Sequence, residues 1–193
     1  MRTMILADRD AGVDLLATIA ENDVECVITC GDLYAYHIRD LAAVTIPKFG
    51  VYGNHCDRGY FDELGITDLH SRRGTLPNGM SVVGLEGCVR YKNEPDVLYT
   101  QEEYAAMLSS YPWKIDVVVT HAPPEGVNDE SDPAHVGITA LREYVDVVGP
   151  RYLLHGHTYP DPHSNRSVGR VSSTRTGCGS SRCDRNVERK PRP

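Results

Sequence analysis

The sequence predicts an α/β protein built on largely parallel sheet. Short apolar, β-branched stretches alternate along the chain with stretches of helical period. The first such unit comprises a strand at 4–7, a helix at 13–19 and a strand at 24–29. Two strands joined through a helix in this order pair in parallel through a right-handed crossover, so both strands end at the same edge of the sheet.

The remaining stretches continue this alternation. An apolar run bounded by Gly or Pro is typical of a strand, and apolar residues spaced three to four apart are typical of a helix. We expect strands at 47–52, 80–85, 115–120 and 152–154, with a second sheet beginning at 80–85. We expect helices at 38–44, 102–108 and 138–148, an irregular or short helical segment at 62–69, and closing antiparallel strands within 167–176.

The chain is organised around residues 27–33, Val-Ile-Thr-Cys-Gly-Asp-Leu. This apolar run stops at Gly31, which allows a sharp turn where the strand leaves the sheet, and Asp32 follows. Open α/β sheets hold their ligands beyond the carboxyl ends of the strands. We therefore predict that Asp32 meets the polar groups that follow the other strands and that together they bind metal. Those groups are Asp8, Gly53-Asn54-His55, Thr120-His121 and Gly156-His157.

The length and net charge of the chain limit the classes of protein to which it can belong. The 193 residues suit one domain, expected at 1–176, followed by a basic, flexible tail at 177–193. The net charge of −7 leaves an acidic body, which disfavours non-specific binding to nucleic acid. No apolar run approaches the roughly 20 residues that span a bilayer, and the first residues lack the layout of a signal peptide. We therefore expect a cytoplasmic protein with no membrane partner, whose six cysteines are reduced.

The predicted donor set favours catalytic metal. Carboxylate, amide oxygen and imidazole together suit divalent ions of borderline softness, and the set lacks the thiolates of a structural zinc site. One carboxylate can bridge two ions, which then activate water and clamp a phosphoryl group. His55 adjoins Asn54 in the sequence and is our candidate for the acid that protonates the leaving alkoxide.

These motifs, from Asp8 to His157, resemble those of the calcineurin-like metallophosphoesterases. The loop at 120–127, Thr-His-Ala-Pro-Pro-Glu-Gly-Val, and the His-Val-Gly at 135–137 are similar to a subgroup of small phosphodiesterases that includes the metallophosphoesterase-domain-containing proteins. The resemblance implies a four-layer α/β/β/α sandwich with mixed sheets. It also implies metal-dependent hydrolysis of small phosphodiesters, with nucleotides or cyclic nucleotides as favoured substrates, by metal-activated water.

The resemblance also implies roles for individual residues. Two divalent ions would be bound, with Mn²⁺ expected first and Fe, Co, Ni or Zn as alternatives. Asp32 would bridge the ions, Asp8 would anchor one site, and His55 would be the catalytic acid or a contact to the substrate phosphate. Three further ligands would complete the other site, namely Asn54, His121 and His157.

The chain departs from the family pattern at three places. The usual Asp-x-His reads Asp8-Arg9-Asp10, and the usual Gly-His-x-His reads Gly156-His157-Thr158-Tyr159. Both changes fall on the site anchored by Asp8, so we expect metal to be weakly held there, with Asp10 as a harder ligand in place of imidazole. Tyr159 would ligate only as phenolate and otherwise supports the site. Cys56 stands where the family commonly has an acidic residue, with Asp57 next to it.

The sequence allows alternative roles for several other residues. Arg9 contacts a substrate phosphate or neutralises the carboxylates beside it. His135 reaches the substrate from its loop or caps the following helix. His155 is expected to support the metal site from behind rather than to bind metal. Tyr34 and Tyr36 wall the pocket or stack on a base, or they are ordinary surface tyrosines, which is the commoner case.

Two other functions fit the same sequence. The first is hydrolysis of phosphomonoesters, including the activity of a protein phosphatase. The second is a binding scaffold that keeps the fold and has lost one metal, and the changed positions Asp10 and Tyr159 favour it. The sequence does not identify the physiological substrate, the native metal or the oligomeric state.

Overall fold

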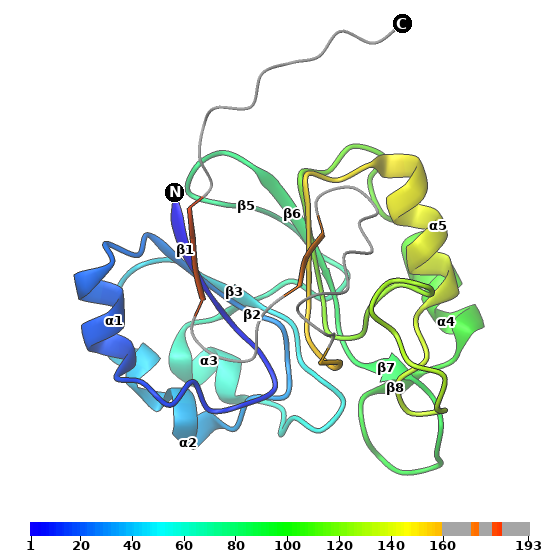
Figure 1. The fold of residues 1–193 in the computed structure, drawn as a ribbon, viewed down its shortest axis with the longest axis horizontal. Coiled ribbons are helices and arrows are strands. Elements are labelled where there is room, and N and C mark those ends of the chain that lie inside the picture. The colour runs from blue at the N-terminus through cyan, green and yellow to red at the C-terminus, as the bar shows by residue number, and fades with distance from the viewer. Residues whose placement is uncertain (160–170, 174–178, 183–193) are drawn as a thin grey trace, which may run out of the picture.

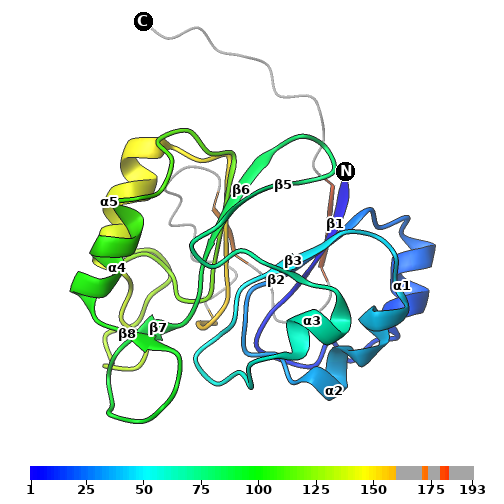
Figure 2. The ribbon, with the colours of Figure 1, turned by 180° about the vertical axis from the view of Figure 1, so that it is seen from behind.

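The computed structural model describes residues 1–159, 171–173 and 179–182. Two five-stranded sheets lie face to face at the centre of the molecule, and helices cover the outer face of each (Figure 1). The view from behind shows the same arrangement, with α1, α2 and α3 on one flank and α4 and α5 on the other (Figure 2).

The first sheet is assembled from the N-terminal part of the chain and one late strand. Its order is β12-β1-β2-β3-β4, and all neighbouring pairs are parallel except β1 with β12. The pairing of β1 with β2 is parallel, as expected from the first strand–helix–strand unit. The strands are β1 (Arg2–Leu6), β2 (Cys26–Thr29), β3 (Lys48–Gly50), β4 (Thr67–Asp68) and β12 (Gly179–Arg182).

The second sheet is built from strands between residues 73 and 173 and has the order β11-β10-β9-β6-β5. Its pairs are parallel except β5 with β6, so both sheets are mixed, as expected. The strands are β5 (Arg73–Thr75), β6 (Ser81–Leu85), β9 (Val117–Thr120), β10 (Tyr152–His155) and β11 (Val171–Ser173). A small parallel pair, β7 (Cys88–Val89) and β8 (Leu98–Tyr99), precedes α4.

The helices form the two outer layers. Those packed on the first sheet are α1 (Leu15–Glu21), α2 (Ala35–Ile38), the 3₁₀ helix η1 (Arg39–Ala43) and α3 (Tyr60–Leu64). Those on the second sheet are α4 (Gln101–Leu108) and α5 (Thr139–Val148). The order helix, sheet, sheet, helix is the predicted four-layer α/β/β/α sandwich, and this prediction is confirmed.

Alternate side chains of each central strand fill different layers of the core. In β2, Val27 packs toward the helices, whereas Cys26 and Ile28 pack between the two sheets. In β9, Val118 faces the outer helices, and Val117 and Val119 face the other sheet. A strand buried on both faces must be apolar at every position, which explains why these segments read as continuous apolar runs. The thiols of Cys26, Cys30, Cys56 and Cys88 are free.

The structure differs from the expected elements near the C-terminus and at the sheet edges. The antiparallel closing strand expected within 167–176 is instead β11, which pairs in parallel with β10. β12 pairs with β1 and lies within the segment 177–193, and the other residues of that segment lie outside the described ones. The short strands β4, β5, β7 and β8 were not expected, because two or three residues are too few to show a period. None of the described helices has the length and apolar character needed to cross a bilayer.

Candidate metal centre

The polar residues predicted from the sequence follow strands that end at the seam between the two sheets. Asp8 follows β1, Asp32 follows β2 and Asn54 follows β3, all in the first sheet. His121 follows β9 and His157 follows β10, both in the second sheet. Because the two sheets pack face to face, their strand ends deliver ligands to one place from opposite sides.

Tight turns direct three of these side chains. Asp8, Asp32 and His157 have φ angles of 62°, 51° and 69°, in the left-handed region that costs a residue with a side chain about 1–3 kcal/mol. Such strain persists where the surrounding structure imposes it, which is common at functional sites. Hydrogen bonds hold these turns, because Asp8 N donates to Gly31 O at 3.0 Å and His157 N donates to Asp8 Oδ1 at 2.8 Å.

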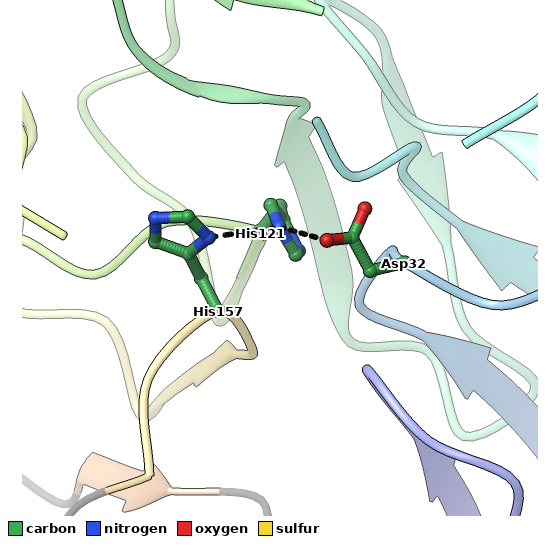
Figure 3. Close-up of side chains that lie close together, drawn as sticks. All are labelled: Asp32, His121 and His157. Atoms are coloured by element: carbon green, nitrogen blue, oxygen red, sulfur yellow. Dashed lines mark hydrogen bonds and ion pairs between the residues drawn. The ribbon is translucent and has the colours of Figure 1, made fainter. Parts of the chain in front are cut away.

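Asp32, His121 and His157 point toward one another (Figure 3). One potential ligand atom from each lies within 4.8 Å of the other two. His121 Nε2 is 3.4 Å from Asp32 Oδ2 and 3.2 Å from His157 Nδ1. The buried Asn54 adds a fourth atom, because its Oδ1 lies 2.9 Å from His121 Nε2. The four predicted ligands of one metal site therefore converge.

The hydrogen bonds of the two histidines indicate which ring nitrogens carry lone pairs. His121 Nδ1 lies 2.8 Å from the carbonyl oxygen of Cys30, so Nδ1 is assigned the proton and Nε2 the lone pair. His157 Nε2 lies 2.7 Å from the carbonyl oxygen of Ala134, so Nδ1 carries its lone pair. The lone pair of His121 lies toward Asp32 Oδ2 and Asn54 Oδ1, and that of His157 lies toward His121 Nε2.

This arrangement suits a divalent cation. In the neutral tautomers, four acceptor atoms face one another with no hydrogen between them, which is unfavourable unless a positive charge lies among them. Two imidazoles, a carboxylate and an amide oxygen form the mixed donor set of Mn²⁺, Fe²⁺, Co²⁺ or Zn²⁺. The carbonyls of Cys30 and Ala134 orient the rings from behind, as is usual for metal-binding histidines.

Burial and neighbouring charges shift the pKa values of the side chains at the site. Burial opposes the charge on Asp32, but the neighbouring His121 charge and the N–H of His55 outweigh it and lower the Asp32 pKa to about 2. Burial likewise opposes the charge on His121, but Asp32 and Asp8 raise its pKa. Burial, reinforced by the His121 charge, lowers the His157 pKa to about 3. A proton on His121 beside Asp32 thus occupies the position that suits a metal ion.

The residues expected at the second metal site are less convergent. The Asp8 carboxylate accepts the N–H of His157, and burial raises its pKa. Asp10 is exposed, accepts the N–H of Gly12 at 3.0 Å and lies 3.7 Å from His37 Nε2. The exposed Tyr159 ring lies under the guanidinium of Arg9, at 4.2 Å. Asp10 and Tyr159 thus make contacts outside the cluster of Asp32, His121 and His157.

His55 lies beside the converging atoms with its ring toward solvent. Its backbone N–H donates to Asp32 Oδ1 at 2.8 Å, and its side chain is 53% exposed. The ring Nδ1 is 3.5 Å from a carboxylate oxygen of Asp96. Cys56 turns inward, and its Sγ accepts the N–H groups of Asp32 at 3.1 Å and Gly53 at 3.2 Å.

The long loop between β9 and α5 borders the site from the other side. The His135 ring lies 5.0 Å from that of His157, and its Nδ1 is 2.8 Å from the Asp132 carboxylate. The buried His155 has its Nε2 3.0 Å from the side-chain amide nitrogen of Asn128. Burial lowers the His155 pKa.

Sequence reasoning missed several parts of this site. Asp96, which approaches His55, lies in a loop with no recognisable motif. The carbonyls of Cys30 and Ala134 are main-chain groups, so no residue type could mark them. The inward position of Cys56 depends on contacts that the sequence does not mark, such as the hydroxyl of Tyr60 at the start of α3, 3.6 Å from the thiol.

Comparisons with known proteins identify the family and agree with the fold. A family model described as calcineurin-like phosphoesterase matches residues 9–161. One crystal structure superposes with a TM-score of 0.65 at 16% identity, covering 91% of this chain and 90% of its own. TT1561 of Thermus thermophilus superposes with a TM-score of 0.57 at 17% identity, covering 80% of each chain. At these identities the two structures bear on the fold alone. The chain has no match among the curated proteins.

Proposed function

The chain belongs to the calcineurin-like phosphoesterase family, a family of metal-dependent phosphoester hydrolases, and from this premise we propose that it hydrolyses small phosphodiesters. The favoured substrates are nucleotides or cyclic nucleotides. The observation that carries the proposal is the convergence of four lone pairs beside an exposed histidine. The choice of diesters is supported by the sequence of the loop at 120–127 and 135–137, which is similar to a subgroup of small phosphodiesterases.

One metal ion would be held by Asp32, Asn54, His121 and His157. Mn²⁺ is the proposed ion, with Fe, Co, Ni or Zn as alternatives. Divalent ions at such a site lower the pKa of water and withdraw charge from the phosphoryl oxygens. The chain contributes the orientation of the ligands, because each histidine ring is fixed by a main-chain carbonyl.

A second ion would be held less tightly, by Asp8 and Asp32. Asp10 could join them only by leaving its contacts with Gly12 and His37. Tyr159 supports this side of the site by stacking with Arg9 rather than by ligating metal. Binding of about two equivalents at millimolar Mn²⁺ and about one after extensive dialysis, measured by elemental analysis, would support this difference between the sites.

His55 would donate a proton to the leaving alkoxide. Its exposed ring is free to approach a substrate, while its N–H helps to fix Asp32. Arg9 is exposed on the Asp8 loop, and its guanidinium suits a phosphate oxygen. His135 would contact the substrate from the opposite loop, close to His157.

The experiment compares hydrolysis of bis-p-nitrophenyl phosphate with that of p-nitrophenyl phosphate in the presence of Mn²⁺. We expect the diester to have the higher kcat/KM, and chelation by EDTA to stop both reactions until Mn²⁺ is restored. A preference for the monoester would replace our proposal by a phosphomonoesterase. Extending the assay to 2′,3′- and 3′,5′-cyclic nucleotides tests the proposed substrate class.

The scaffold hypothesis keeps one supporting observation, which is the outward position of Asp10 and Tyr159. It predicts binding of one ion or none and no hydrolysis of any phosphoester with any divalent ion. Metal-stimulated hydrolysis that disappears in the Asp32→Ala variant would exclude it.

A further inference from the structure

An exposed cluster of aromatic side chains follows the loop that carries Asp32. Tyr34 and Tyr36 are 53% and 63% exposed, and their rings stack with centroids 5.5 Å apart. The His37 ring meets the edge of Tyr36 with centroids 4.0 Å apart. We name these three residues the aromatic rim. Neighbouring exposed rings of this kind are unusual for a surface turn and are typical of binding surfaces.

Buried neighbours and a main-chain hydrogen bond hold the backbone of the aromatic rim in place. Leu33 and Ile38, which bracket it in the sequence, are each 3% exposed and pack into the core between the helices and the first sheet. The N–H of His37 donates to the carbonyl of Tyr34 at 3.0 Å and closes the turn. Because the backbone is already ordered, a ligand that stacks on the rings loses little affinity to ordering the protein.

The rim is connected to two loops that carry residues of the metal centre. Tyr34 is two residues from Asp32 in the sequence. His37 Nε2 lies 3.7 Å from Asp10, which belongs to the loop that begins with Asp8. Arg9, which lies between Asp8 and Asp10 in that loop, presents its guanidinium over the Tyr159 ring. The rim and the Arg9 guanidinium thus lie on or against the segments that carry Asp8, Asp10 and Asp32, on the side of the centre that has the weaker metal ligands.

We propose that the aromatic rim binds the base of a nucleotide whose phosphate lies at the metal centre. The inference rests on the proposed function for the class of ligand. Every base has a π face, so stacking on an aromatic side chain contributes to affinity largely independently of which base is bound. The rim therefore selects nucleotides over phosphoesters without a base, and it does so without discriminating strongly among bases.

The test measures binding to the Mn²⁺-loaded full chain by isothermal titration calorimetry. The two probes are adenosine 5′-monophosphate and ribose 5-phosphate, which share the phosphate and the sugar but differ in the base. We expect the wild type to bind the first about tenfold more tightly, which corresponds to about 1.4 kcal/mol. The double variant Tyr34→Ala/Tyr36→Ala should bring the ratio of the two dissociation constants close to one.

Two matched variants control the experiment. Tyr34→Phe/Tyr36→Phe keeps both rings and should keep the preference for the base. Trp113→Ala removes another exposed aromatic residue, which is 76% exposed. Trp113 precedes β9, at the end of that strand opposite to His121, so this variant should also keep the preference. Thermal unfolding of each variant verifies that it is folded at the temperature of the titration.

The outcomes separate this inference from the proposed function. Equal affinity of the wild type for both probes, or an unchanged preference in the alanine double variant, would overturn the role of the rim. Hydrolysis of adenosine 2′,3′-cyclic monophosphate is measured in parallel. A protein that prefers adenosine 5′-monophosphate through the rim but hydrolyses no phosphoester would disprove the enzymatic proposal and leave the base-binding surface in place.

Discussion

Replacing Gly53 by alanine isolates the contribution of the position of Asp32. A Cβ atom at residue 53 would lie 2.6 Å from Asp32 Cγ and closer still to Asp32 Oδ1 and N. Real Cβ atoms essentially never approach other heavy atoms within 3.0 Å, so the two residues must move apart by several tenths of an ångström or more. The φ angle of Gly53 is outside the left-handed region, so the substitution adds a steric clash without backbone strain.

The expected loss of activity exceeds the loss of stability. Overpacking in a dense region costs about 1–3 kcal/mol, which lowers the Tm of a chain of this size by about 2–12 °C. A displacement approaching 1 Å in a catalytic group, however, reduces the rate about 10²-fold. Hydrolysis of bis-p-nitrophenyl phosphate is measured with saturating Mn²⁺ and well below the Tm of the variant. Under these conditions the assay reports the loss of catalytic rate without the loss of stability.

The matched control is Gly79→Ala. Gly79 has a φ of 83°, and a Cβ atom there would have no heavy atom of the described residues within 4 Å beyond its chain neighbours. Alanine at this position therefore strains the backbone by about 1–2 kcal/mol and touches nothing in the site. We expect a similar loss of Tm and a kcat/KM close to that of the wild type. A folded Gly53→Ala variant with wild-type kcat/KM would refute the view that Asp32 must stay where the turn places it.

The remaining predictions concern individual ligands and protons. Asp32→Ala should abolish metal binding and activity together, as measured by elemental analysis and by the diester assay. His55→Ala should reduce kcat about 10²–10⁴-fold while metal content stays near normal, and loss of metal in this variant would contradict the proposed role. Since Asp32 and Asp8 raise the pKa of metal-free His121, binding of Mn²⁺ should release protons and weaken as the pH falls, which calorimetry in buffers of different ionisation enthalpy detects. Because the pKa of His157 is about 3 in the folded metal-free protein and about 6.5 when unfolded, the unfolded chain binds more protons in this range. The free energy of unfolding in EDTA should therefore fall as the pH is lowered below 6.5, by up to about 1.4 kcal/mol per pH unit for this group, and His157→Asn should make the fall shallower in urea titrations at pH 6 and pH 5.

The central strands were predictable because they are buried on both faces. The segments that became β2, β9 and β10 are apolar at almost every position, and that pattern is readable within each segment alone. The strand that became β11 shows the limit of such reading. Its direction depends on its neighbour β10, so three residues of local sequence could not distinguish parallel from antiparallel pairing.

The position of Asp10 shows the same limit at the site. Its residue type and its spacing from Asp8 predicted a metal ligand, and the role remains a prediction. The structure shows its carboxylate accepting the N–H of Gly12 and lying close to His37 of α2. Competition between partners of similar strength decides where such an exposed side chain lies, and a sequence pattern carries no measure of that competition.

The sequence by itself determined which strands exist and which chemical groups stand at their ends, because burial and turn formation depend on neighbouring residues. Only the tertiary structure decided which atoms of those groups face one another. The lone pair of His157 is selected by the carbonyl of Ala134, 23 residues away, and that of His121 by the carbonyl of Cys30, 91 residues away. Hydrogen bonds between groups so distant in the chain form only in the folded structure. The bond from His121 Nδ1 to the carbonyl of Cys30 joins the two sheets, so their packing turns a set of polar strand ends into a site with a defined geometry.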